Sequence, residues 1–203
     1  MIDNTNITLD YYNKEAKNFS DCTQSINFSA LQDEFCSYVP KHGHILDLGC
    51  GAGRDSKAFI NAGYKVTAMD GSEELCKVAR AYIGQDVICS TFQSYQPNEE
   101  FDGIWACASL LHLSYDDIIS VMSKLANFLK TNGCFYASFK YGDFSGIRNG
   151  RFFQNMTEEE FKKILEKIPS YKVISSKITS DVRPGRENEK WLNIFLKKVE
   201  VEQ

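Results

Sequence analysis

Two short turns in the second half of the chain each carry a pair of arginines. RNGR contains Arg148 and Arg151, and RPGR contains Arg183 and Arg186. These are four of the chain's six arginines, although the formal net charge is −4. Because a guanidinium group presents a planar fork of N–H donors that matches a carboxylate or a phosphate, the two turns predict a binding site for an anionic group. The alternative is solvated turns or ion pairs with nearby carboxylates, for which the candidates are Asp143, Asp181, Glu187 and Glu189.

A glycine-rich segment, GCGAGRD at 49–55, could hold a second ligand. Gly49, Gly51 and Gly53 leave room for a backbone turn that a Cβ atom would block, and they let a ligand lie against the chain at a helix N-terminus. The dinucleotide-binding pattern G-x-G-x-x-G is not met, because Arg54 stands three residues after Gly51. The segment therefore favours another ligand. Glycines that only shape a turn in an inert α/β protein are the alternative.

Two further side chains could act on a ligand at this place. Asp70 ends the strand-like run KVTAMD and can accept hydrogen bonds from a ribose diol, so its spacing from the glycine segment suits a bound nucleoside. His112, in SLLHLS, is the histidine expected near the pocket, since His42 and His44 precede the first strand at the opposite edge. Histidine can act as a general base near neutral pH. A histidine bonded to backbone at a helix start is the alternative for His112.

The elements that must position these residues include several short strands. Buried-strand runs occur at 44–48, 65–70, 86–90, 101–107 and 134–140. They alternate with helical segments, which predicts a parallel sheet covered by helices on both faces. The final two strands, 171–179 and 191–199, have no helix between them and predict an antiparallel hairpin.

Two helical patterns, at 8–19 and 29–39, precede the first strand. Helices along the chain are expected to begin at side chains that can cap them, which are Thr8, Ser72, Ser114 and Thr157.

The two arginine turns follow the fifth and sixth strands. Both strands are expected to run parallel to the first, so both turns should lie at the edge of the sheet where the glycine segment lies. So much positive charge in one place is unfavourable unless an anionic group shares the space. This placement strengthens the prediction of an anionic ligand.

ILDLGCGAGRDS, followed by VTAMDGS, FDGIWACASLLH and LKTNGCFYASF, resembles the class I S-adenosylmethionine (SAM)-dependent methyltransferases. The resemblance spans about residues 8–200, and these segments fall in the family's order and spacing. It implies a Rossmann-like α/β fold with a seven-stranded, mostly parallel sheet in the order 3-2-1-4-5-7-6, whose last strand is antiparallel. It also implies SAM as the cofactor, S-adenosylhomocysteine (SAH) as the product, and no metal.

The resemblance also assigns roles around the cofactor. Asp47 would orient the glycine loop and reach the methionine amino group directly or through water, and Asp70 would hold both ribose hydroxyls. Cys107 and Ala108 would contact the cofactor near its sulfonium. The cofactor-binding residues that it implies are Asp47, Gly49, Cys50, Gly51, Gly53, Asp70, Gly71, Ser72, Phe92, Cys107 and Ala108.

The adenine ring would lie against Gly71, Ser72 and Phe92. Many members of the family carry an aspartate after the third strand that receives the adenine amino group, whereas this chain reads STFQ. Thr91 or Gln93 must therefore substitute for it.

The first helix closes over the cofactor as a lid in many relatives, and here it carries Tyr11 and Tyr12. Tyr11 and His112 are the candidate catalytic residues, although both tyrosines would also suit a hydrophobic core. The resulting prediction is one domain over 1–203, with a helical lid at 1–40 and an α/β core at 41–200.

Three classes of acceptor or partner are open. The favoured one is a small anionic metabolite with a carboxylate or phosphate, or a thiol or metalloid oxyanion, as the similarity to the tellurite-resistance branch implies. The second is tRNA carrying a carboxymethyl group on a wobble uridine. The third is a SAM-binding partner protein that has no acceptor.

Composition bounds the remaining classes. The chain has 203 residues, of which 43% are hydrophobic and 25% charged, as expected for one globular domain. It has no apolar run that could span a bilayer and no secretory signal, so we expect a cytoplasmic protein without a membrane partner. Its seven cysteines lack the spacing of a zinc site. The acidic balance argues against a broad nucleic-acid surface, and we expect a monomer or weak dimer.

Overall fold

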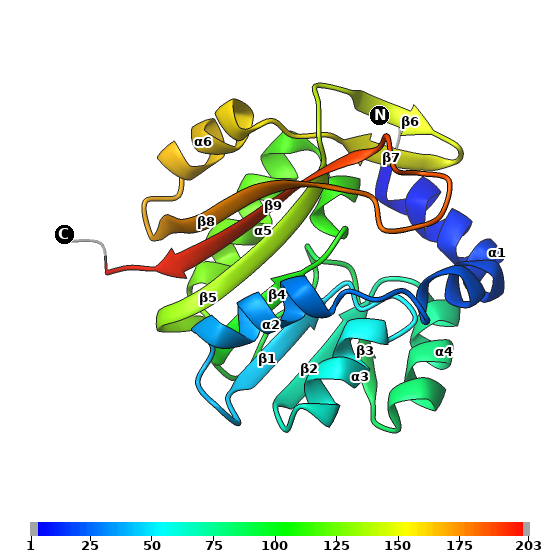
Figure 1. Ribbon diagram of the computed structural model, residues 1–203, viewed down its shortest axis with the longest axis horizontal. Coiled ribbons are helices and arrows are strands. Elements are labelled where there is room, and N and C mark those ends of the chain that lie inside the picture. Colours follow the sequence, from blue (N-terminus) through cyan, green and yellow to red (C-terminus); the bar gives the residue numbers. More distant parts are fainter. Residues whose placement is uncertain (1–3, 201–203) are drawn as a thin grey trace.

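The computed structural model describes residues 4–200, so the six terminal residues of the predicted domain lie outside the described part. A seven-stranded sheet has helices on both faces, and two further strands form a separate hairpin (Figure 1). The strands of the large sheet are β1 (His44–Leu48), β2 (Lys65–Asp70), β3 (Val87–Cys89), β4 (Phe101–Ala106), β5 (Leu129–Lys140), β8 (Tyr171–Ser180) and β9 (Lys190–Lys198). The helices are α1 (Asn4–Thr23), α2 (Ser29–Tyr38), α3 (Arg54–Asn61), α4 (Glu73–Ile83), the short 3₁₀ helix η1 (Leu110–His112), α5 (Tyr115–Ala126) and α6 (Glu158–Glu166).

The sheet has the predicted topology. Its order is β3-β2-β1-β4-β5-β9-β8, in which β9 runs antiparallel to both neighbours and the other pairs are parallel. The fold class expected from the sequence is therefore confirmed. Among the residues that the structure describes, no helix is long and apolar enough to cross a membrane.

Successive residues of the central strands pack on opposite faces of the sheet, as the period of two requires. Ile104 and Phe135 belong to the hydrophobic cluster that includes α5 and α6. Trp105 and Tyr136 stack with their ring centroids 3.9 Å apart and belong to the cluster that includes α2, α3 and α4. Figure 1 shows α2 and α3 in front of the sheet and α5 behind it. The two faces therefore have separate cores.

Three of the four predicted caps are confirmed. Ser72, Ser114 and Thr157 each accept a hydrogen bond from a backbone N–H in the first turn of their helix. The prediction for Thr8 is wrong, because α1 begins by Asn4 and Thr8 lies inside it. The Thr8 hydroxyl instead accepts the Phe152 N–H at 3.1 Å, so it attaches α1 to the segment after β5.

The turn RNGR was expected to lie in a loop, but it joins two strands. β6 (Ser145–Arg148) and β7 (Arg151–Gln154) pair as an antiparallel hairpin. The turn residues Asn149 and Gly150 have φ values of 49° and 74°. Positive φ at both positions of a two-residue loop is typical of a type I′ hairpin turn, for which Asn-Gly is a strong signal.

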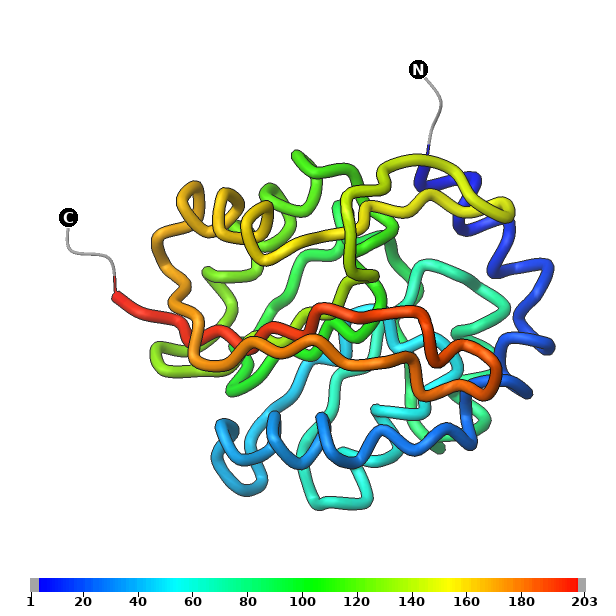
Figure 2. The backbone as a smooth tube through the Cα atoms, turned by 45° about the horizontal axis from the view of Figure 1, so that its top comes forward, coloured from blue at the N-terminus to red at the C-terminus, as the bar shows by residue number. Residues whose placement is uncertain are grey.

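The helix α1 crosses the carboxyl edge of the sheet. Figure 2 shows the β6–β7 hairpin and the turn between β8 and β9 reaching toward α1 from the other side of that edge, and Figure 1 agrees. The helix α2 instead packs on the sheet, where Phe35 contacts the ring of Trp105. The two arginine turns and α1 are thus assembled around one edge of the sheet.

Gly103 in β4 allows α2 to approach the sheet, because a Cβ atom there would lie 2.7 Å from Phe35 and 2.8 Å from Val39. We expect Gly103→Ala to lower the free energy of unfolding by about 1–3 kcal/mol through overpacking, measured by urea denaturation. Val39→Ala should cost less in the Gly103→Ala background than in the wild type, because it makes room for the added methyl group. Additive effects of the two changes would contradict this packing.

Candidate functional site

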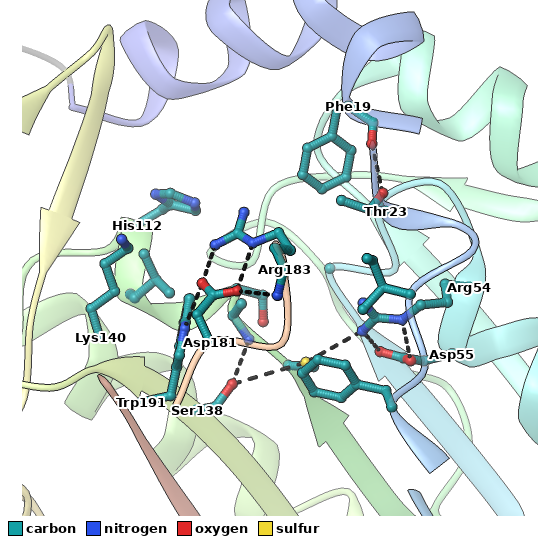
Figure 3. A pocket seen from close by; sticks show the side chains of 18 of the residues that line it. Phe19, Thr23, Arg54, Asp55, His112, Ser138, Lys140, Asp181, Arg183 and Trp191 are labelled. Atoms are coloured by element: carbon teal, nitrogen blue, oxygen red, sulfur yellow. Dashed lines mark hydrogen bonds and ion pairs between the residues drawn. The ribbon is translucent and has the colours of Figure 1, made fainter. Parts of the chain in front are cut away.

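A cavity of about 1310 Å³ lies at the carboxyl edge of the sheet. Its lining includes the loop after β1, the end of β2, the segment after β4, one side of α1, and both arginine turns. Pockets for one small ligand usually measure about 300–1,000 Å³, so this cavity has room for two molecules. Ligands of open α/β sheets bind at this edge. Figure 3 shows Arg183 and Lys140 toward one end of the cavity and Arg54 toward the other.

The loop after β1 has a backbone that requires glycine. Gly49, Gly51 and Gly53 have φ values of 82°, 54° and 86°. Gly49 and Gly51 line the cavity. Gly53 does not contribute to the lining; a Cβ atom there would lie 2.9 Å from Ile83, so this glycine lets α3 pack closely on α4.

The Asp70 carboxylate closes the glycine loop. One oxygen accepts the Gly51 N–H at 2.8 Å and the other accepts the Ser72 N–H at 2.9 Å. Burial raises the pKa of Asp70, and these backbone hydrogen bonds oppose the increase. A carboxylate has about four lone-pair sites, so Asp70, which lines the cavity, can still accept hydrogen bonds from a ligand.

Two residues that the resemblance places at the cofactor, Ser72 and Asp47, form hydrogen bonds within the protein and lie outside the cavity lining. Ser72 donates to Asn13 at 2.7 Å and caps α4, and it is not part of the cavity lining. Asp47 is 2% exposed, lies outside the lining, and accepts a hydrogen bond from Ser56 at 2.6 Å. Burial, together with the negative charge of Asp55, raises the pKa of Asp47.

Arg54 also lines the cavity, although the sequence did not indicate it as a site residue. Its Nε and one Nη donate to the two carboxylate oxygens of Asp55, both at 2.8 Å. Burial opposes ionisation of Asp55, but this guanidinium holds its pKa below the usual value. Trp105 donates to the same carboxylate at 2.9 Å and Arg54 lies over the Phe28 ring, so the orientation of Arg54 is fixed from several sides.

The segment after β4 supplies Cys107, Ala108 and Ser109 to the lining. Burial raises the pKa of Cys107 to about 12, so its thiol is neutral at pH 7. Ala108 has a φ of 50°, and its N–H donates to Ser138 at 2.8 Å. The Ser109 hydroxyl is buried without a hydrogen-bond partner, next to Gly49. Most of the other residues expected near the cofactor line the same end: Cys50, Gly71, Thr91, Phe92 and Gln93.

A chain of hydrogen bonds connects Arg151, Tyr12 and His112. His112 Nδ1 lies 2.7 Å from the Phe152 carbonyl, which can only accept, so Nδ1 carries the proton. Nε2 therefore accepts from the Tyr12 hydroxyl at 2.9 Å, and Arg151 donates to the same hydroxyl at 3.4 Å. Burial lowers the pKa of His112 to about 4, so the ring is neutral at pH 7.

Tyr12 rather than Tyr11 lines the cavity. Tyr11 packs edge-on against Tyr12, lies 4.3 Å from the Arg151 guanidinium, and contacts the hairpin turn at Gly150. Of the two tyrosines, Tyr12 is therefore better placed than Tyr11 to contact a ligand in the cavity.

All four arginines of the two turns line the cavity, but their surroundings differ. Arg183 forms two side-chain hydrogen bonds with Asp181, which hold the pKa of Asp181 at about 2 against the opposing effect of burial. Arg186 lies 3.8 Å from Glu189. Arg148 lies over the Phe144 ring, and neither it nor Arg151 has a carboxylate partner among the described residues. Pairing with neighbouring carboxylates, the alternative that the sequence left open, thus applies to the second turn.

Comparison with known proteins bears on both the sequence and the fold. A family model described as a methyltransferase domain matches residues 45–133. YqeM of Bacillus subtilis is 30% identical over 57% of this chain and 57% of its own length. A ubiquinone biosynthesis O-methyltransferase of Xanthomonas campestris is 30% identical over 46% of this chain and 41% of its own. The matched region spans less than two thirds of either relative.

Two solved structures share the fold over most of the chain. The 1,6-didemethyltoxoflavin-N1-methyltransferase of Burkholderia thailandensis, with bound 1,6-didemethyltoxoflavin and SAH, aligns with a TM-score of 0.71 at 20% identity over 95% of this chain and 85% of its own. The magnesium protoporphyrin IX methyltransferase of Synechocystis with bound SAH also aligns with a TM-score of 0.71. Its sequence identity is 17%, and the alignment covers 96% of this chain and 99% of its own. At these sequence identities the comparison shows a shared fold and nothing further.

The low pKa of His112 should appear in the pH dependence of stability. The unfolded chain binds a proton at this ring near pH 6.5 and the folded chain only near pH 4. The contribution of His112 to the free energy of unfolding is therefore complete above pH 6.5 and is lost as the pH falls to 4. We expect His112→Asn to reduce that loss by up to about 3 kcal/mol, measured by urea unfolding at several pH values. His42→Asn, which removes an exposed imidazole, is the control and should follow the wild type. A His112→Asn profile parallel to the wild type would contradict the assignment.

Proposed function

Because the chain carries a methyltransferase domain with the class I fold, we propose that it transfers a methyl group from SAM to a small anionic acceptor. The observation that carries the proposal is the single cavity that joins Asp70 and the glycine loop to the arginine turns. Its volume of about 1310 Å³ suits a cofactor and an acceptor side by side.

The cofactor end of the cavity fits SAM by its own residues. Asp70 offers acceptor positions for ribose hydroxyls, and the buried Ser109 hydroxyl has no protein partner and can meet a polar ligand atom. Phe92 provides an apolar surface for the adenine, and Thr91 or Gln93 supplies polar groups beside it. Bound SAM would supply a methyl group activated by its sulfonium charge.

The charge of the lining supports an anionic acceptor. Seven cationic side chains and four carboxylates line the cavity, although the whole chain has a formal net charge of −4. A cleft with a local excess of positive charge and low-dielectric walls attracts anions. Small anions rather than a broad polyanion are favoured, because the excess charge surrounds one cavity.

The Tyr12–His112 pair offers no strong base, which favours an acceptor atom that carries no proton at neutral pH. The low pKa of His112 makes it a weak base, and its Nε2 is engaged by Tyr12. His112 therefore serves chiefly to position the Tyr12 hydroxyl at the cavity. A carboxylate oxygen is already anionic at neutral pH and requires only alignment, which can contribute roughly 7–11 kcal/mol.

The cofactor assignment is tested at Asp70. We expect Asp70→Ala to weaken SAM binding at least 100-fold by calorimetry, because it removes both the ribose acceptor and the partner of the Gly51 N–H. Asp143→Ala, at an exposed carboxylate outside the lining, is the matched control. Circular dichroism checks that both variants fold. Unchanged SAM affinity in a folded Asp70→Ala protein would remove the cofactor assignment.

The acceptor class is tested by incubating the protein with methyl-labelled SAM and cell extract separated into small-molecule and RNA fractions. We expect label in the small-molecule fraction with the wild type and not with Asp70→Ala. Label in RNA would favour a tRNA acceptor instead, and binding of SAM without any transfer would favour a regulatory protein.

A further inference from the structure

Three buried polar side-chain atoms in the described part of the chain have no hydrogen-bond partner. They are Ser109 Oγ, Arg151 Nε and Asn155 Oδ1, and all three residues line the cavity. An unsatisfied buried polar group costs about 1–3 kcal/mol, so such groups indicate where a ligand supplies the missing partner. Ser109 adjoins the glycine loop. The other two come from β7 and the residue that follows it.

β7 presents one face to the cavity. Arg151, Phe153 and Asn155 line it, whereas Phe152 and Gln154 between them do not. This alternation is the period of an extended strand, in which every second side chain shares a face at intervals of about 7 Å. The Asn155 N–H donates to the Phe144 carbonyl at 2.8 Å, which continues the hairpin pairing past β7. A cation, an aromatic ring and an amide therefore stand in a row along one wall.

Arg151 is the cation of this row, and no carboxylate of residues 4–200 forms an ion pair with it. Its guanidinium lies 4.3 Å from the Tyr11 ring centroid and 5.1 Å from that of Phe153, and it donates a hydrogen bond to the Tyr12 hydroxyl. The Arg183 side chain, by contrast, is bound by Asp181. A partly buried cation without a counter-ion is unfavourable, so an anionic group is needed beside Arg151.

Asn155 sets a second condition on the ligand. Its side chain is buried, with 7% of the residue exposed, and Oδ1 has no donor. A carbonyl oxygen can only accept, so the ligand must bring an N–H or O–H group to it. Phe153, Tyr12 and Trp191 line the same region and provide flat apolar surfaces between and around these polar groups.

We infer that this face of β7 is the acceptor subsite: Arg151 binds an anionic group, and Asn155 accepts a hydrogen bond from an N–H or O–H of the same molecule. The inference rests on the proposed methyl transfer and narrows the acceptor to a small molecule with a flat apolar body, an anionic group and a hydrogen-bond donor. Asn155 was not among the residues that the sequence indicated. Its role follows from its place on the strand that carries Arg151.

The test uses the full chain saturated with SAH and three probes of similar shape, which are benzamide, benzoate and 4-hydroxybenzoate. Benzamide is the neutral counterpart of benzoate, and 4-hydroxybenzoate adds an O–H donor. We expect the wild type to bind benzoate at least 10-fold more tightly than benzamide, and 4-hydroxybenzoate several-fold more tightly than benzoate, by calorimetry or ligand-observed NMR.

Each variant should remove one of these preferences. Arg151→Met should abolish the advantage of benzoate over benzamide, and Asn155→Leu should abolish the advantage of 4-hydroxybenzoate over benzoate while the charge preference remains. Gln154→Leu is the matched control, since it removes a side-chain amide from the opposite face of the same strand and should retain both preferences.

The affinity of each protein for SAH separates the possible failures. If the wild type binds no SAH, the proposed function fails. If SAH binds but benzoate has no advantage over benzamide, or if Arg151→Met keeps that advantage, the subsite inference alone is overturned. Retained SAH affinity in the variants also shows that they remain folded.

Discussion

The Asp70 carboxylate is the interaction on which the arrangement of the site depends. It ends β2, and its two oxygens accept backbone N–H groups from the loop after β1 and from the start of α4. Three elements that meet at the carboxyl edge are thus joined by one side chain. Because these bonds use only part of its accepting capacity, the group that shapes the glycine loop can also bind a ligand. A substitution at Asp70 would therefore change both the glycine loop and any ligand contact made there.

Charge is distributed unevenly between the cavity and the rest of the chain. The chain is acidic overall, yet cations outnumber carboxylates along the cavity lining. Within the lining, Asp181 and Asp55 fix Arg183 and Arg54 by paired hydrogen bonds. These arginines act as rigid parts of the wall. Arg151 is held by aromatic rings and the Tyr12 hydroxyl instead, and no carboxylate of the described residues pairs with it.

The sequence predicted the strands and most helix caps well, because both depend on local patterns, whereas the strand order followed from the resemblance to the methyltransferase family. HILDL and its successors are short apolar runs separated by helices, and Ser72, Ser114 and Thr157 are caps in the structure. The β6–β7 hairpin was missed, although Asn149-Gly150 is a hairpin signal, because the flanking runs are only four residues long. The tellurite-resistance branch of the family, which the sequence favoured, stays a prediction.

The site was predicted less completely, because its details depend on tertiary contacts. The sequence indicated Gly53 and Ser72 as ligand contacts, and it could not show that Gly53 allows α3 to pack on α4 or that Ser72 lies outside the cavity lining. That Arg148 and Arg151 lack a carboxylate partner among the described residues could not be read from RNGR and RPGR, since both turns have carboxylates nearby in sequence. Asn155 carries no motif, and only the strand direction of β7 brings it to the cavity.

The helix α1 connects the two ends of the cavity. Asn13 accepts a hydrogen bond from Ser72 beside the glycine loop, whereas Thr8 and Tyr12 bind Phe152 and His112 beside β7. The Tyr12 hydroxyl lies between Arg151 and His112, so it links α1 to β7 and to η1. Hydrogen bonds from one helix therefore join the two ends of the cavity.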